Sequence, residues 1–494
     1  MPGLNAGLFI GLSGLQAQQS ALNVVGHNIA NVNTPGYSRQ RADLSSNLST
    51  VEGQVYFGTG VSLNTVQGIR DRFLDLQIYR ETARQTGANE RFSGVDAVSS
   101  SIGDTGETGI GAQVQAFFQS FQELATKPED MALRQNVVGK AQTMISGLQT
   151  RYRLLKDQRG SADQAVTSLL GEVNTLTSQI AKLNQQIATE STTGSNNDAW
   201  DQRKTLTDRL AGLVGINVTE SVKGEYQITL DTGAAVLVSS NTSYALQKGA
   251  IDPASGYAKV VSSMGNLLVD VTQSIREGQL GAKLDLRDNI LVGFQRQLDQ
   301  LAAGVAGEVN KAHKAGFILD AATAGGDFFV ASGTNSNGGA DLPVGILAGS
   351  FYRGMVEKLS VNSAVTSDLS LIAAAGVTGA KGDNTVANNI ANLQSQIKTV
   401  DTNGDGTADS GPFSTVIGGL VNDVGTQSMT YRAQSDTQQN LVVALQNQRD
   451  RISGVDLDEE ATSMMTLQRG YQASARFLSV INQLTDQLVN QFGR

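Results

Sequence analysis

A heptad repeat of apolar residues in the first half of the chain constrains the fold more than any other feature. Its first series holds Val138, Ile145, Tyr152, Arg159, Val166, Val173, Ile180 and Ile187, and its second holds Ala141, Leu148, Leu155, Ala162, Leu169, Leu176 and Leu183. Only Arg159-Gly160 interrupts the seam, and such a repeat is typical of one long helix in a left-handed supercoil. We expect this helix to pack inside its own domain, with an intermolecular coiled coil as the alternative.

Both chain ends carry a similar apolar stripe. No Lys, Arg, Asp or Glu precedes Arg39, and the predicted N-terminal seam is Leu8, Leu15 and Leu22. The predicted C-terminal seam is Met464, Leu467, Tyr471, Leu478, Ile481 and Leu488, in a helix that can start at the acidic run Asp458-Glu459-Glu460. An uncharged amphipathic end is marginal as an isolated helix and becomes ordered on binding. We therefore predict that the two ends pair with each other.

Size and composition exclude several classes of protein. A chain of 494 residues is too long for one core. The net charge of −9 and the lack of a basic patch disfavour nucleic acid as a partner, and the absence of Cys excludes disulfides and thiol catalysis. No apolar run is long enough to span a membrane, and the N-terminus lacks the positive start of a secretory signal.

The order of patterns along the chain predicts an α+β multidomain fold, with paired, coiled-coil-like terminal helices, a long helical bundle and β-rich inserted outer domains. Alternation of apolar and polar residues around Tyr226, Ile228 and Leu230 marks the first insertion, and helical periodicity returns at 386–400 and 413–452. The predicted domains are residues 1–45 with 453–494 (terminal coiled coil), 46–215 with 276–316 and 382–452 (helical bundle), 216–275 (β-rich insertion) and 317–381 (second β-rich or mixed insertion).

A compact polar motif follows the N-terminal helix. The residues that we single out in it are Asn28, Ile29, Asn31, Asn33, Thr34, Gly36 and Tyr37. Asn tolerates left-handed geometry and bonds its own backbone, so the three Asn residues can end the helix. Thr34-Pro35-Gly36 suits a type II turn, after which Tyr37 can pack back on the helix. Composition alone favours an ordinary helix stop.

Catalytic residues are not evident. His27 and His313 are the only imidazoles, they lie far apart in the sequence, and neither has the Ser or Asp neighbours of a triad. We read both as structural residues and expect no enzymatic activity.

One segment resembles the front half of an EF-hand-type calcium loop. Its candidate ligands are Asp401, Asn403, Asp405, Thr407 and Asp409. Gly406 allows the sharp turn, but Pro412 stands where such a loop has its bidentate Glu. Calcium is therefore the only cofactor that the sequence suggests, and a solvated acidic turn is the alternative.

The N-terminal motif resembles one shared by bacterial flagellar rod, hook and hook-associated proteins. The resemblance rests on Ser13-Gly14-Leu15, Ala21-Leu22 and the run from Asn28 to Tyr37. The C-terminal runs 452–460 and 468–476, with Asp201-Gln202-Arg203, Leu286-Arg287-Asp288-Asn289, Gln297-Leu298-Asp299 and Gly382-Asp383-Asn384, are similar to the hook-associated protein 1 family.

The resemblance implies a structural subunit of a ring that joins hook to filament and lets the filament assemble. It implies as partners further copies of the chain, the hook protein, a second junction protein (hook-associated protein 3) and an export chaperone. It also implies an extracellular place on the flagellum, reached by flagellum-specific type III export without a cleaved signal. The alternatives are another axial protein of hook or rod type, or a secreted adhesin-like protein acting through its β insertions.

Overall fold

A computed structural model describes residues 2–52, 55–102, 106, 109–190, 196–253, 255–265, 267–320, 322–331, 354–396, 398–400 and 409–492. Packing divides the chain into two compact units. Unit 1 comprises residues 1–87, 169–280 and 436–494, and unit 2 comprises residues 88–168 and 281–435. Three long helices, α2 (Arg72–Ile102), α4 (Met131–Glu190) and α11 (Phe413–Ser453), contribute to both units. Within the described residues, no helix is both long enough and apolar enough to cross a membrane.

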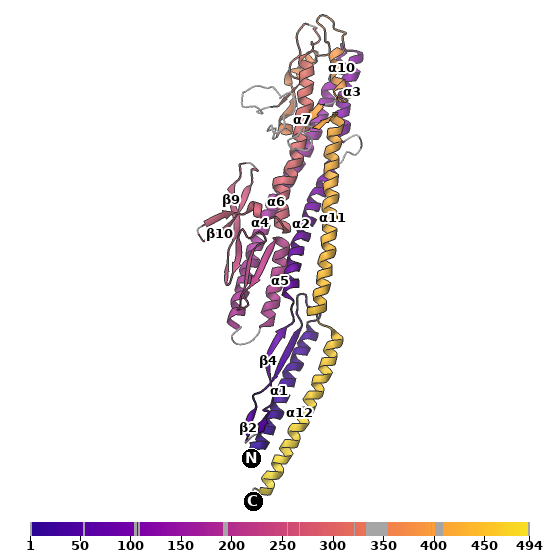
Figure 1. The fold of residues 1–494 in the computed structure, drawn as a ribbon. Coiled ribbons are helices and arrows are strands. Elements are labelled where there is room, and N and C mark those ends of the chain that lie inside the picture. Colours follow the sequence, from indigo (N-terminus) through magenta and orange to yellow (C-terminus); the bar gives the residue numbers. More distant parts are fainter. Residues whose placement is uncertain are drawn as a thin grey trace. The chain divides into compact units, whose positions relative to one another are not determined.

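The two chain ends lie together in unit 1 (Figure 1). Helix α1 (Pro2–Ala30) pairs with α12 (Leu457–Phe492), and the first and last of the four strands between α1 and α2 pack on α1. These strands are β1 (Gln40–Ser46), β2 (Thr50–Glu52), β3 (Val55–Phe57) and β4 (Val61–Gly68). Strand β1 pairs with β4 and β2 with β3, both antiparallel. The predicted domain boundary at residue 45 falls inside β1, so the structure groups the whole hairpin with α1 and not with the helical bundle.

Unit 1 also contains helix α5 (Asn197–Leu213) and two antiparallel sheets. The first sheet has the order β5-β6-β7-β8 and the second β11-β10-β9. Their strands are β5 (Ile216–Glu220), β6 (Tyr226–Leu230), β7 (Val236–Ser239), β8 (Thr242–Ser243), β9 (Leu246–Ile251), β10 (Ala258–Met264) and β11 (Leu267–Asp270). The alternating pattern predicted strands in this segment, and the structure confirms them. The turn η2 (Thr272–Ser274) and the start of α6 (Gly278–Asp285) follow.

Buried Arg203 of α5 fixes the first sheet to the helices. Its guanidinium lies 4.5 Å from the ring centre of Trp200 and 3.5 Å from that of Tyr226, and its NH1 donates to Gly224 O at 2.6 Å. Cation–π stacking and a hydrogen bond together compensate for burying this charge.

Unit 2 is built from helices with short strands between them. Its further elements are α3 (Ile110–Thr126), the π-helical turn η3 (Leu286–Ile290), α7 (Leu291–Lys314), β12 (Phe329–Ala331), α8 (Met355–Lys358), β13 (Leu359–Val361), α9 (Ser363–Ser367), η4 (Leu369–Leu371), α10 (Thr385–Asn392), β14 (Lys398–Val400) and β15 (Asp409–Gly411). Helix α10 ends at Asn392, so the helix predicted up to Val400 is wrong in its last part. Residues Lys398–Val400 form strand β14, which the β-branched Thr399 and Val400 favour.

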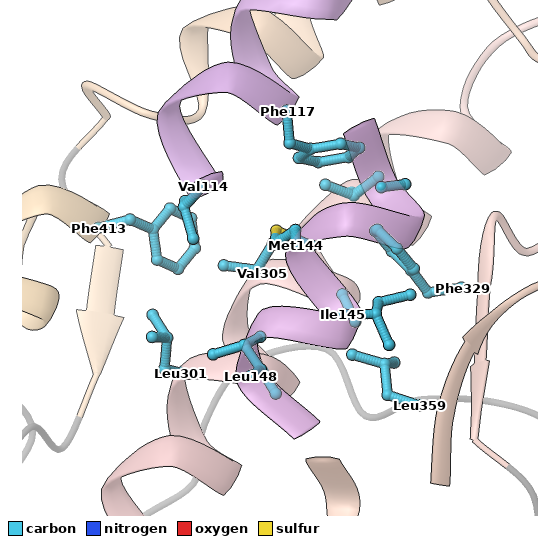
Figure 2. Packing of buried hydrophobic residues seen from close by; sticks show 14 of the residues in the cluster. Val114, Phe117, Met144, Ile145, Leu148, Leu301, Val305, Phe329, Leu359 and Phe413 are labelled. Carbon is cyan, nitrogen blue, oxygen red and sulfur yellow. The ribbon is translucent and has the colours of Figure 1, made fainter. Parts of the chain in front are cut away.

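One apolar cluster forms the core of unit 2. Figure 2 shows Val114 and Phe117 of α3 facing Met144, Ile145 and Leu148 of α4. The same view adds Leu301 and Val305 of α7, Phe329, Leu359 and Phe413. This packing confirms that the first part of the long heptad helix finds its partners within the same chain.

Almost all of the first heptad series of α4 is buried. The buried members are Val138, Ile145, Tyr152, Val166, Val173, Ile180 and Ile187. At the predicted interruption, Arg159 Nε instead donates to Arg287 O at 2.8 Å. In the second series Ala141, Leu148, Leu155, Ala162 and Leu176 are buried, whereas Leu169 and Leu183 are half-buried and the residues one position later, Leu170 and Asn184, are buried. A straight helix of 3.6 residues per turn drifts in this direction relative to a strict seven-residue repeat.

Candidate assembly site

The packing of α1 on α12 brings the two ends of the chain together. The facing residues are Gly7 with Ile481, Gly11 with Leu478 and Gly14 with Ser474. Residue numbers rise on α1 as they fall on α12, so the helices are antiparallel. A Cβ placed on Gly11 would lie 2.9 Å from Leu478 Cδ1 and 3.3 Å from Phe477 Cδ1. Since real Cβ atoms do not approach other carbons so closely, the helix spacing at this point depends on glycine.

Small residues, and not leucines, form the buried stripe of α1. The buried residues are Gly7, Gly11, Ala17, Ala21 and Val25. The predicted seam residues Leu8, Leu15 and Leu22 are half-buried and flank this stripe. Heptad analysis gives weight to large apolar residues and reads glycine as a helix breaker. The recurrence of Gly or Ala every three or four positions was the signal that could have identified the stripe.

The predicted seam of α12 shares one face of the helix. Met464, Leu467, Tyr471, Leu478, Ile481 and Leu488 are all half-buried. On its neighbouring flank Phe477, Val480 and Leu484 are 43%, 52% and 45% exposed. The part that these side chains play between subunits stays a prediction.

Asn28 closes the end of α1 through a complete set of hydrogen bonds. The residue is 1% exposed. Its Nδ2 donates to Gln40 O at 2.8 Å and to Glu460 Oε2 at 3.1 Å. Its Oδ1 accepts from Gln40 N at 2.9 Å and from the Tyr37 hydroxyl at 2.8 Å. Both donors and both acceptor directions of the amide are therefore used.

The predicted left-handed geometry of the asparagines is wrong, since Ser240 is the one non-glycine residue with positive φ in the described part of the chain. Asn31 instead stays in the helical register, where its Nδ2 donates to His27 O at 3.0 Å. Ile29 is half-buried and Asn33 is exposed.

The turn after the helix is the predicted type II turn. Tyr37 N donates to Thr34 O at 3.2 Å, and Gly36 has φ of 82°. Tyr37 packs back on the helix end as expected, with its ring centre 5.6 Å from that of His27. A Cβ on Gly36 would lie 2.5 Å from Thr205 Oγ1 of α5, so conformation and space both require glycine here.

After this turn the chain enters a cluster of charged and polar groups, which we call the charged node; its members are Ser38, Arg39, Arg70 and Asp201. Ser38 N donates to Asp201 Oδ2 and Arg70 NH2 donates to Asp201 Oδ1, each at 3.1 Å. Burial raises the pKa of the Asp201 carboxyl, while Arg70 and the Ser38 N–H act in the opposite direction. Burial, together with the nearby Asp201 charge, raises the pKa of Tyr37, which keeps this hydroxyl a neutral donor.

The same node holds the start of α12. Arg39 N donates to Ser453 O at 2.9 Å, which satisfies a carbonyl at the C-terminal end of α11. Arg39 Nε donates to Glu460 Oε1 at 2.7 Å, and the Arg39 guanidinium also pairs with Glu459. Sequence reasoning missed Arg39 and Asp201, because nothing in the local pattern places residues so distant along the chain side by side.

The described contacts of His313 are those of a structural residue. His313 is fully buried, its Nδ1 lies 2.7 Å from Gly326 O, and its Nε2 accepts from Ala373 N at 2.9 Å. Both ring nitrogens are therefore engaged in hydrogen bonds to the backbone. The calcium-loop residues 401–408 lie outside the described residues, as does the side chain of Asp409. Among the side chains that are described, no cluster of His, Asp or Glu could hold a metal.

Comparison with known proteins gives three matching family models. The model "Flagellar hook-associated protein FlgK helical domain" matches residues 95–329. "Flagella basal body rod protein" matches residues 8–37, and "Flagellar basal body rod FlgEFG protein C-terminal" matches residues 446–491. The last two matches cover most of α1 with the turn that follows it, and nearly all of α12.

Whole-length relatives agree with these matches. The chain is 28% identical to flagellar hook-associated protein 1 of Escherichia coli (strain K12), over 97% of this chain and 98% of the relative. It is 27% identical to the protein of that name from Bacillus subtilis (strain 168), over 97% and 96%. The solved structure of the flagellar hook junction protein FlgK from Burkholderia pseudomallei shares the fold, with a TM-score of 0.64 and 19% identity over 76% of this chain and 100% of that one. The chain is therefore similar to flagellar hook-associated protein 1 over nearly its whole length.

Proposed function

We propose that the chain is a structural subunit of the junction between the hook and the filament of the bacterial flagellum. Its copies form a ring there, and filament assembly proceeds on that ring. The antiparallel packing of α1 on α12 through Gly7, Gly11 and Gly14 is the observation that carries the proposal. It gives both chain ends one joint role, and the family models of rod-type proteins cover both ends.

The partners follow from this place in the flagellum. We propose that the chain binds further copies of itself, the hook protein and hook-associated protein 3, and that a chaperone holds it before export. Exposed apolar side chains on the helix pair, among them Phe9 (68%) and Val480 (52%), suit contacts with neighbouring subunits. The proposed location is extracellular, after export without a cleaved signal.

The role is structural and needs no catalysis, so we propose that the chain is not an enzyme. We retain calcium binding at Asp401–Asp409 as a separate proposal for stiffening a loop. Isothermal calorimetry of the purified chain and of an Asp405→Ala variant tests it. Calcium-dependent heat in the unmodified chain alone supports the site, and no heat in either protein at millimolar calcium refutes it.

A deletion strain tests the junction role. Cells without the chain are expected to build hooks, to lack filaments and to shed flagellin into the medium, and a plasmid copy restores filaments. Normal filaments in the deletion strain would contradict the proposal, and missing hooks would place the protein earlier in assembly.

A further inference from the structure

Glu460 is a buried carboxylate with both oxygens bound by the other end of the chain. The residue is 2% exposed and lies in the first turn of α12. Its Oε1 accepts from Arg39 Nε at 2.7 Å and its Oε2 accepts from Asn28 Nδ2 at 3.1 Å. Neighbouring Glu459 also pairs with Arg39, but its side chain is 63% exposed.

The contact with Asn28 extends into a closed network. The amide of Asn28 also binds both backbone polar groups of Gln40 and the hydroxyl of Tyr37. Without α12, one donor of Asn28 has no protein partner and Arg39 loses its buried acceptor. Without the segment from Asn28 to Gln40, the carboxylate of Glu460 loses both of its side-chain partners. Incomplete buried networks of this kind are unfavourable, since each unpaired polar group keeps its desolvation cost.

The backbone makes the coupling stronger. Arg39 N donates to Ser453 O, and Ile69 N donates to Arg39 O at 2.8 Å. A Cβ on Gly454 would lie 2.2 Å from Asp450 O, so the break between α11 and α12 requires glycine at this position. The N-terminal turn, the entry to α2 and the start of α12 are thus fixed at one point.

We propose that Glu460 is a positioning residue that makes the ordering of the two chain ends a single event. The end of α1 is complete only when Glu460 is in place, and α12 takes its direction only when Asn28 and Arg39 hold that carboxylate. When one chain end of a subunit docks, the other end therefore becomes ordered as well. Subunits with only one ordered end do not accumulate. This inference rests on the proposed function for its biological consequence, but the coupling is a property of the chain itself.

Four variants of the full chain test the coupling in the deletion strain. Glu460→Gln removes the charge at nearly constant shape, and Asp458→Asn, at an exposed position of the same helical turn, is the matched control. Asn28→Asp places a second carboxylate against Glu460. The double variant Asn28→Asp with Glu460→Gln replaces that repulsion with an amide donor facing a carboxylate. The amount of chain in purified hooks and the amount in the medium are measured for each variant.

We expect Asp458→Asn to incorporate as the unmodified chain does, and each single change at Glu460 or Asn28 to lower incorporation about tenfold at constant export, as the loss of a buried charged hydrogen bond predicts. The double variant regains part of the loss, which two independent defects would not do; the rest remains because the oxygen introduced by Asn28→Asp still faces Gln40 O. Full incorporation of Glu460→Gln, or a double variant as poor as the product of the singles, overturns the proposal. Thermal unfolding of the purified variants, expected to be unchanged for unit 2, separates misfolding from failed positioning. If the unmodified chain itself fails to restore filaments, the proposed function falls, while the rescue pattern still reports on the coupling.

Discussion

Replacing Gly11 with leucine tests whether close approach of α1 and α12 matters. The first added atom would lie 2.9 Å from Leu478 Cδ1, and three further carbons must enter space that Leu478 and Phe477 fill. Overpacking of this kind costs about 1–3 kcal/mol, against a gain of about 1 kcal/mol from the higher helix propensity of leucine. The net loss of up to about 2 kcal/mol lowers the equilibrium constant for pairing by up to about thirtyfold.

Gly26 offers a matched control in the same helix, because a Cβ there meets no atom within 4 Å. Gly26→Leu keeps the propensity gain of about 1 kcal/mol without the clash. Filament number in the complemented deletion strain, and flagellin shed into the medium, are the readouts. We expect Gly11→Leu to lose filaments, Gly26→Leu to keep them, and the addition of Leu478→Ala to restore part of the loss in Gly11→Leu. Equal filament numbers for Gly11→Leu and the unmodified chain would refute the reasoning.

Two further substitutions follow from the structure. Gly36→Val forces a β-branched residue into φ of 82° against Thr205, so we expect junction assembly to fail while the purified chain stays soluble; normal swimming in a motility assay would contradict this. Burial lowers the pKa of His313 from 6.5 to about 4, so the unfolded state binds a proton first as pH falls. The unfolding free energy should therefore drop by about 3 kcal/mol between pH 6.5 and 4, and this part of the drop should be absent in His313→Gln when urea unfolding is measured across that range. The same pH slope in both proteins would show that His313 is not the group responsible.

Periodicity in the sequence predicted the long elements of the fold well. The seven-residue spacing from Val138 to Ile187 correctly predicted one helix, and the Pro35-Gly36 pair correctly predicted the turn. Both are local features, in which side-chain spacing or a single backbone angle determines the structure. The short strands β12 and β13 depend on contacts between distant segments, which leave little trace in the local pattern. The stripe of small residues on α1 is visible as a recurrence of Gly or Ala, but heptad analysis reads glycine as a helix breaker.

Contacts between residues far apart in the sequence also made the assembly motif hard to predict. The sequence placed Asn28 at the helix end but assigned it a local role in bonding its own backbone. Its partner Glu460 lies 432 positions away, and an acidic residue in the first turn of a helix is normally explained by the helix dipole alone. Burial of Glu460, which the sequence does not reveal, distinguishes a network member from a solvated charge.

A disulfide between the two chain ends tests the central claim, that they pair within one subunit in the assembled junction. The chain has no Cys, and a Cβ on Gly14 would lie 3.7 Å from Ser474 Cβ, inside the range of about 3.5–4.5 Å that disulfides require. Flagella from cells that carry Gly14→Cys with Ser474→Cys are oxidised and run on a non-reducing gel beside the pair Gly26→Cys with Ser474→Cys. Gly26 lies about 18 Å farther along α1, beyond reach of Ser474. The account predicts an internal disulfide that shifts the monomer band in the first pair alone; no disulfide, or cross-linked dimers in its place, would contradict it.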